Sequence, residues 1–278
     1  MQKIGPKIPI NRGVRPLFTR YNLAIMYPPF SAVKVIFFDL GSTLIYSKDP
    51  WPPIYKQADR ALVKVLQQAG IALEVNAFSN EFGTFLDSYY AGRGAGTIEK
   101  TTFSLLGDLL EQNGFQDIPA SVVRAALDAN YSVTQRNWYL EADAIPTLKT
   151  LREQGYRLGM ISNTSDDLNV QQLVDRCGLR PYFDTILTSA GCGIRKPDER
   201  IFHLALDYFG VAPEQTAMVG DTLEADILGA NQLGMYSLWI TRRAQVPEEG
   251  ELKIQPQAVI TALDQIPELL AEIKNDAP

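Results

Sequence analysis

Residues Val33–Leu40 read VKVIFFDL, a run of β-branched and aromatic side chains broken only by Lys34 and by Asp39 near its end. Its length is typical of a strand, and the turn-forming pair Gly41–Ser42 follows directly. Near-continuous apolarity favours a strand covered on both faces, as in a parallel sheet. A carboxylate directly after such a strand is costly unless an ionic group meets it, so Asp39 is the first candidate functional residue.

Similar short apolar runs recur later in the chain, each next to a helical pattern. We predict these strands at Tyr156–Ile161, Phe183–Leu187, Thr216–Val219 and Tyr236–Ile240, followed by a short strand and a closing helix within Ala258–Ile273. Alternation of strand and helix implies right-handed crossovers within one sheet. The predicted fold class is therefore α/β, with a doubly wound, Rossmann-like parallel sheet.

The stretch from Asp49 to about Leu140 interrupts this alternation. It has no comparable strand, and its periodicity predicts helices at Ile54–Gln68, Asn76–Tyr90, Thr97–Gln112 and Ala120–Val133. A crossover this long is abnormal unless it folds by itself. We therefore predict a poorly ordered extension at 1–31, an α/β core formed by 32–48 and 141–278, and an inserted helical cap at 49–140. Its aromatic residues, Trp51, Tyr55, Tyr89 and Tyr90, are interpreted as cap core.

Composition narrows the class of partner. The 278 residues are 46% hydrophobic, which is enough for a full-sized core, and carry a formal net charge of −6. An acidic chain is a poor partner for nucleic acid or anionic lipid, so we expect a small-molecule partner. No apolar run is long enough to span a bilayer, and Cys177 and Cys192 are too few for a disulfide framework. We expect a cytoplasmic protein with reduced thiols, and leave its oligomeric state open.

Polar residues follow each of the first four long strands. In an open parallel sheet these positions converge on one crevice. Carboxylates there can hold a hard cation, an ammonium and hydroxyls can hold phosphate oxygens, and one carboxylate can attack. The set is Asp39, Gly41, Ser42, Thr43, Ser162, Asn163, Thr164, Arg195, Lys196, Asp221 and Asp226.

In order and spacing these residues resemble the haloacid dehalogenase-like hydrolases, over roughly Val33 to the C-terminus. The family's first motif is matched by Asp39–Thr43 (DLGST), its second by Ser162 in ISN, its third by Lys196 in RKPD, and its fourth by Gly220–Asp226 (GDTLEAD). Short motifs recur by chance, but four in the right order, each after a predicted strand, are a specific signal.

The resemblance implies a role for each residue. Asp39 would attack phosphorus and form an aspartyl phosphate, while Lys196 and Ser162 would stabilise the transferring phosphoryl group. Mg²⁺ would be held by Asp39, the Gly41 carbonyl, Asp221 and Asp226. Phosphate-binding groups are assigned to Gly41, Ser42, Thr43 and Asn163. The implied activity is a Mg²⁺-dependent phosphomonoester phosphatase that acts on small phosphorylated metabolites.

One position departs from the family's pattern. Most phosphatases of the family carry a second aspartate two residues after the nucleophile, as general acid and base, and here that residue is Gly41. We favour a substitute acid from the cap, such as Asp49 or Tyr55, or a leaving group that needs no assistance. A carbon–phosphorus hydrolase using Lys56, Lys64 or Lys100 as a Schiff base, and a phosphate- or partner-binding module with weak turnover, remain alternatives. Metal-independent dehalogenation is less favoured, because Asp221 and Asp226 are retained.

Overall fold

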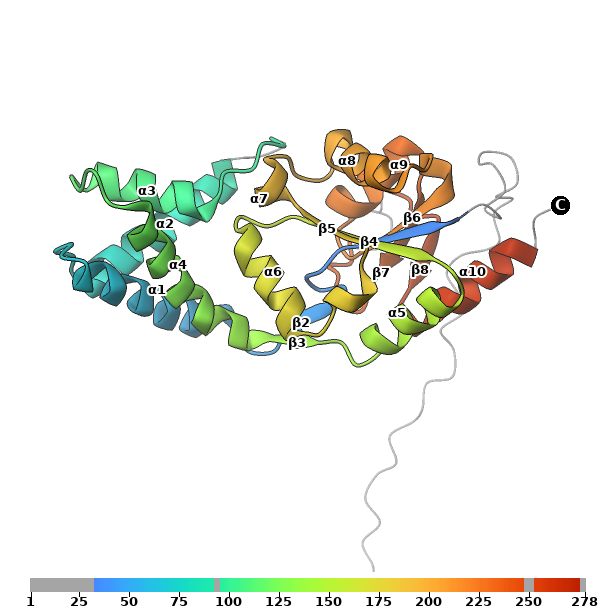
Figure 1. The fold of residues 1–278 in the computed structure, drawn as a ribbon, viewed down its shortest axis with the longest axis horizontal. Coiled ribbons are helices and arrows are strands. Elements are labelled where there is room, and N and C mark those ends of the chain that lie inside the picture. Colours follow the sequence, from blue (N-terminus) through green and yellow to red (C-terminus); the bar gives the residue numbers. More distant parts are fainter. Residues whose placement is uncertain (1–32, 93–95, 248–252, 276–278) are drawn as a thin grey trace, which may run out of the picture.

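A six-stranded parallel sheet forms the centre of the computed structural model, which describes residues 33–92, 96–247 and 253–275 (Figure 1). The predicted extension at 1–31 lies outside these residues. The strand order is β5-β4-β1-β6-β7-β8, so the strand that directly precedes Asp39 is central. The predicted doubly wound α/β class is confirmed. The strands are β1 (Val35–Phe38), β4 (Arg157–Ser162), β5 (Thr185–Thr188), β6 (Thr216–Gly220), β7 (Tyr236–Ile240) and β8 (Ala258–Ile260).

Helices cover both faces of this sheet. Successive residues of a strand point to opposite faces, so each strand contributes side chains to the core on both sides. Ile36 and Phe38 of β1 join one hydrophobic cluster, whereas Val35 and Phe37 join another. The first cluster includes residues of α5 (Ala144–Glu153), α6 (Asp167–Arg176) and α10 (Ile266–Asn275). The second includes residues of α8 (Glu199–Phe209) and α9 (Leu228–Leu233). Shorter turns are α7 (Ser189–Cys192), η3 (Gln135–Asn137), η4 (Arg180–Tyr182), η5 (Pro213–Gln215), η6 (Leu223–Ile227) and η7 (Leu263–Gln265).

The stretch predicted to be a cap folds into helices around a hydrophobic cluster of its own, at one end of the molecule (Figure 1). These are α1 (Trp51–Gln68), α2 (Val75–Gly92), α3 (Thr102–Gln112) and α4 (Ala120–Thr134). The chain enters and leaves through a two-stranded antiparallel sheet, β2 (Ile45–Ser47) with β3 (Trp138–Leu140). Because this part has a separate core and a narrow connection, we propose that 49–140 forms an inserted cap.

The predicted helix at Thr97–Gln112 begins five residues late, at Thr102. Thr101 accounts for the difference, because its side chain accepts a hydrogen bond from the Ser104 amide and so caps the helix there. The residues before it contact the core instead. Ile98 forms a β-bridge with Ile194, and the Arg195 amide donates to the Thr97 carbonyl at 2.8 Å.

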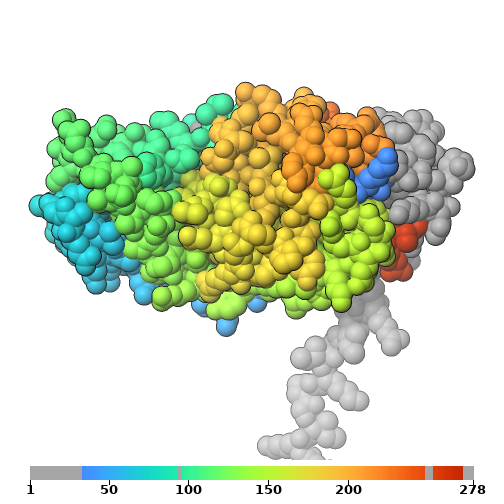
Figure 2. Space-filling view, viewed as in Figure 1, coloured from blue at the N-terminus to red at the C-terminus, as the bar shows by residue number. Residues whose placement is uncertain are grey.

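Polar contacts hold the cap helices against the core. The Thr102 amide donates to the Ser165 carbonyl at 2.8 Å, and the Arg124 guanidinium pairs with Asp166 at 2.7 Å. Cap and core consequently present one continuous surface in the space-filling view (Figure 2). Among the described residues, no helix has both the length and the apolarity to cross a membrane.

Candidate active site

A buried lysine joins two carboxylates at the carboxyl end of the central strands. Lys196 is 2% exposed, and its Nζ donates to Asp39 Oδ1 at 2.8 Å, Asp226 Oδ1 at 2.6 Å and the Ile161 carbonyl at 2.6 Å. An ammonium has three protons to donate, so its capacity is filled. The loop after β5 therefore places the Lys196 ammonium against Asp39, the residue that follows β1.

The ammonium is held in its charged form. Burial by itself would lower the pKa of Lys196, but the negative charges of Asp226 and Asp39 outweigh it and leave that pKa above its ordinary value. A fixed positive charge thus lies against Asp39 without a proton to give at neutral pH. A positive charge in this position can stabilise the negatively charged oxygens of a group that binds at the Asp39 carboxylate.

Asp226 holds Lys196 from the far side. One of its carboxylate oxygens accepts from Lys196, and the other accepts from the Thr222 amide at 3.0 Å. The segment after β6 opens with a π-helical turn, η6, which carries Asp226 and leads into α9. Such segments are frequent at functional sites. Because both oxygens are engaged, these contacts favour a positioning role for Asp226 over direct metal ligation.

Gly220 leaves the space that Asp226 occupies. A Cβ atom on Gly220 would lie 2.2 Å from the Asp226 carboxyl carbon, closer than any real contact allows. We expect Gly220→Ala to displace Asp226 and Lys196, with a loss of about 1–3 kcal/mol in unfolding free energy and a fall in kcat. Denaturant unfolding and steady-state kinetics measure both, with Gly107→Ala, whose added Cβ meets no atom within 4 Å, as the control. Wild-type behaviour of Gly220→Ala would contradict this account.

Asp221 adds a third carboxyl group, for which the ammonium has no proton left to donate. Burial, together with repulsion from Asp39 and Asp226, raises the pKa of Asp221 to about 7. Its backbone is fixed, because the Trp239 indole N–H donates to the Asp221 carbonyl at 2.8 Å. Three carboxylates facing one ammonium leave an excess of negative charge, which a divalent cation would relieve.

The oxygen ligands near these carboxylates form only part of the coordination shell of a divalent cation. No group of three or more His, Cys, Asp or Glu side chains within 33–92, 96–247 and 253–275 is arranged to hold a metal. Asp39 and Asp221 could supply two carboxylates, and the resemblance implies the backbone carbonyl of Gly41 as a third donor. Mg²⁺ characteristically binds through one or two carboxylates and keeps several waters, so a set of this size is compatible with it.

In the compact turn after Asp39, some polar groups form hydrogen bonds within the turn and others do not. Ser42 adopts a positive φ of 59°, and its amide donates to the Ile45 carbonyl at 2.7 Å, so this amide serves the turn itself. Thr43 is fully buried, and its hydroxyl oxygen has no hydrogen-bond partner among the described residues. Buried polar groups are normally paired, so an unpaired hydroxyl beside the site supports a role in ligand binding.

The end of β4 is tied to the lysine loop. The Lys196 amide donates to the Asn163 side-chain oxygen at 2.8 Å, and the Asn163 side-chain nitrogen donates to the Lys196 carbonyl at 3.0 Å. Both ends of the Asn163 amide are therefore used by backbone, which favours a positioning role over phosphate binding. Ser162 is buried at the end of β4, while Thr164 receives support from Ser189, which accepts from its amide at 2.8 Å.

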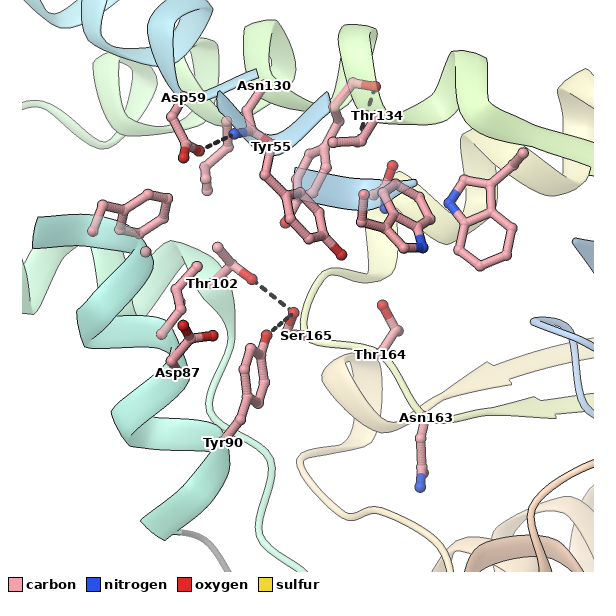
Figure 3. A pocket seen from close by; sticks show the side chains of 18 of the residues that line it. Tyr55, Asp59, Asp87, Tyr90, Thr102, Asn130, Thr134, Asn163, Thr164 and Ser165 are labelled. Atoms are coloured by element: carbon pink, nitrogen blue, oxygen red, sulfur yellow. Dashed lines mark hydrogen bonds between the residues drawn. The ribbon is translucent and has the colours of Figure 1, made fainter. Parts of the chain in front are cut away.

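A pocket of about 710 Å³ opens between the cap helices and this strand end (Figure 3). Asn163, Thr164 and Ser165 line it from the core. The interpretation of the cap aromatics as core was wrong for Trp51, Tyr55 and Tyr90. Tyr55 is 51% exposed and Tyr90 is 37% exposed, and both line the pocket. Tyr90 is fixed there by donating to the Ser165 hydroxyl at 3.1 Å.

Trp138 lies beside the turn that follows Asp39, and sequence patterns did not indicate this contact. A Cβ atom added to Gly41 would lie 3.6 Å from the Trp138 ring, so the indole occupies space beside the position where the family's second aspartate stands. Trp138 lies on β3, about 100 residues along the chain from Gly41. Only the antiparallel pairing of β2 with β3 brings the two together.

Comparison with known proteins decides the family. The model of the haloacid dehalogenase-like hydrolases matches residues 33–234, well over half of the chain. The chain belongs to this family. The resemblance inferred from the four motifs is therefore confirmed.

Individual relatives differ in how much they share. Over 113 residues the chain is 42% identical to a phosphoserine phosphatase of Thermus thermophilus, covering 41% of this chain and 44% of that enzyme. It is 30% identical to a ribulose-1,5-bisphosphate 5-phosphatase of Halopiger xanaduensis, over 73% of this chain and 82% of that one. A solved 2-haloacid dehalogenase from Pseudomonas syringae pv. Tomato superposes with a TM-score of 0.63 at 26% identity, over 86% and 99% of the two chains.

Proposed function

We propose that this hydrolase is a Mg²⁺-dependent phosphatase of small phosphorylated metabolites that works through an aspartyl phosphate on Asp39. The observation that carries the proposal is the buried Lys196 ammonium 2.8 Å from Asp39, with Asp221 as a further carboxylate at the next strand end. Related enzymes named as phosphatases of phosphoserine and of ribulose-1,5-bisphosphate support a phosphomonoester substrate.

The proposed reaction has two displacements. A carboxylate oxygen of Asp39 attacks phosphorus, and the bond from phosphorus to the ester oxygen breaks with its electron pair going to the leaving alcohol. Water then attacks the phosphorus, the bond to Asp39 breaks, and inorganic phosphate leaves with the carboxylate restored. Splitting one hard hydrolysis in this way lowers each barrier. Lys196 balances charge on the phosphoryl oxygens throughout.

The residues that would hold Mg²⁺ are Asp39, Asp221 and the carbonyl of Gly41. When bound, the cation supplies positive charge that offsets repulsion between the phosphate and the carboxylates. We assign Asp226 to the support of Lys196, since its two oxygens accept from Lys196 and from Thr222. Ser162 and Thr43 are the hydroxyls proposed to meet phosphate oxygens.

Tyr55 is the better of the two cap candidates for the missing acid. It lines the pocket, whereas Asp49 is exposed and lies outside the pocket lining. Burial raises the pKa of Tyr55, and the nearby Tyr90, Asp59 and Asp87 add to this effect. Tyr55 is protonated at neutral pH and so has a proton to donate, but the raised pKa makes it a weak acid, which suits it only to leaving groups that need a full proton.

The alternative chemistries have less support. A carbon–phosphorus hydrolase needs a cap lysine at the substrate, but Lys56, Lys64 and Lys100 are all exposed and none lines the described pocket. The structural neighbour named as a 2-haloacid dehalogenase keeps dehalogenation as a rival. Excess carboxylate charge around Asp39 disfavours it, because halide release requires anion-binding groups.

Hydrolysis of 4-nitrophenyl phosphate is the direct test, since its leaving group needs little protonation. We expect phosphate release with Mg²⁺ and its loss with a chelator, restored by adding Mg²⁺ back. Fluoride release from fluoroacetate in chelator would instead establish dehalogenation. Tight binding of inorganic phosphate without turnover of any phosphate ester would support the binding module.

Gly41→Asp tests the missing acid. The added Cβ meets only Trp138, at 3.6 Å, and Gly41 has no positive φ, so aspartate fits without backbone strain. A positioned acid is worth ~10²–10⁴-fold, so we expect alkyl phosphates to be hydrolysed at least about tenfold faster, with little change for 4-nitrophenyl phosphate. Gly107→Asp on α3 is the matched control. Unchanged or slower alkyl phosphate hydrolysis would mean that an existing group already delivers the proton.

A further inference from the structure

The pocket under the cap has an unusual balance of charge. Its lining includes the carboxylates Asp59, Asp87 and Glu99, and no lysine, arginine or histidine among the described residues. Glu99 accepts from the Ser189 hydroxyl at 3.0 Å and lies 3.7 Å from the Arg195 guanidinium, so a core cation partly offsets its charge. Asp59 and Asp87 form no ion pair with any residue in the described ranges. The end of the pocket formed by the cap is therefore negative.

Asp59 and Asp87 lie on α1 and α2, and Figure 3 shows both on the cap side of the pocket, across from Thr164 and Asn163. Burial raises the pKa of Asp59 to about 6, although the Asn130 side chain, which donates to it at 3.0 Å, opposes the rise. Despite this rise, Asp59 is mostly ionised at neutral pH. A half-buried carboxylate without a cation is unfavourable, and a positively charged ligand would remove that cost.

Aromatic rings connect the catalytic turn to these carboxylates. Trp138 lies beside Gly41, its ring centre is 5.3 Å from that of Trp51, and Trp51 stacks on Tyr55 at 5.1 Å with the planes 13° apart. All three rings line the pocket, and Tyr55 is near enough to Asp59 and Asp87 to feel their charge. The faces of such rings attract cations. The rings thus form a wall that runs from beside Gly41, two residues after Asp39, toward the cap carboxylates.

We infer that the physiological substrate is a phosphate monoester whose leaving group carries a cationic nitrogen, held against these rings and directed toward Asp59 and Asp87. The inference rests on the proposed phosphatase function. The same geometry selects against a second phosphate or a carboxylate on the leaving group, because such a group would meet like charge with no described base in the pocket to pair with it.

Three para-substituted phenyl phosphates test this preference, and the two that are compared most directly, aminomethyl and ethyl, match in size. They carry aminomethyl, ethyl or carboxymethyl groups, so the leaving groups are cationic, neutral and anionic while the reacting bond stays the same. We expect kcat/KM to be about tenfold to a hundredfold higher for the aminomethyl than for the ethyl compound, and lowest for the carboxymethyl compound. The difference should lie mainly in KM, because the distinguishing group is remote from phosphorus.

Asp59→Asn combined with Asp87→Asn should reduce the aminomethyl-to-ethyl ratio to near one. Glu111→Gln, which neutralises an exposed acid on α3 outside the pocket lining, should leave the ratio unchanged. Equal kcat/KM for the three compounds, or a preference for the carboxymethyl compound, overturns the inference while the phosphatase function stands. So does a ratio that survives in the double variant.

Absence of hydrolysis for all three compounds would overturn the phosphatase function instead. Binding of the matching phenols to the full-length protein then decides the inference, measured by quenching of tryptophan fluorescence. Tighter binding of 4-(aminomethyl)phenol than of 4-ethylphenol, lost in the double variant, upholds a cation-selective pocket. Equal binding of the two phenols overturns it.

Discussion

Asp39→Asn should reduce kcat for phosphate release by at least about 10⁴-fold, since it removes the proposed nucleophile. Asparagine has nearly the same shape as aspartate, and Lys196 keeps its contacts with Asp226 and the Ile161 carbonyl. The variant should therefore remain folded, with a circular dichroism spectrum and an unfolding midpoint close to those of the wild type.

The covalent intermediate gives a second readout for Asp39. After acid quenching during turnover, intact-mass spectrometry should find one added phosphoryl group on the wild-type chain and none on Asp39→Asn. Asp175→Asn is the matched control, because Asp175 is an exposed carboxylate of α6 that pairs with Arg180 rather than with the site. Phosphate release by Asp39→Asn at a rate near that of the wild type would remove the basis of the proposed mechanism.

Lys196→Met should cause the largest combined loss of activity and stability. The ammonium is buried and pairs with Asp39 at 2.8 Å and with Asp226 at 2.6 Å, so its removal leaves two carboxylates uncompensated. Breaking a buried pair from one side costs about 3–5 kcal/mol in unfolding free energy. Loss of its charge at the phosphoryl oxygens should lower kcat by a further ~10²–10³-fold.

The stability loss of Lys196→Met should depend on pH in a defined direction. Burial already raises the pKa of Asp226 to about 6, and without the opposing ammonium this pKa should rise further above its value in the unfolded chain. Between these values the folded state binds more protons, so its stability falls as pH rises. Denaturant unfolding should therefore show a larger difference from the wild type at pH 8 than at pH 5.

A double variant separates charge from packing. Lys196→Met with Asp226→Asn removes one of the two stranded carboxylates, and we expect it to recover part of the lost stability and much less of the activity. A Lys196→Met protein with wild-type stability at both pH values would show that the buried ammonium is not the counter-charge of these carboxylates. Unchanged kcat would show that it does not act on the phosphoryl group.

Local sequence was enough for the α/β fold and for the positions of the site residues along the chain. Fully buried parallel strands must be continuously apolar, which makes them visible, and the polar residue that ends each one is visible for the same reason. Asp39, Ser162 and Asp221 are of this kind, each at or directly after the end of its strand. Helix positions in the cap were also predictable, because each helix buries a single face.

What the sequence did not determine depends on residues far apart in the chain. Asp226 reaches Lys196 because η6 is π-helical and because Gly220 has no Cβ atom. The hydrophobic periodicity of the sequence indicates neither feature. Trp138 reaches Gly41 only because β3 pairs with β2. The sequence pattern predicted Tyr55 and Tyr90 to be core residues. In the structure, the cap and the core leave a pocket between them, and both tyrosines line it. Periodicity records which face of an element is buried, whereas the partner that it meets is chosen by packing over the whole fold.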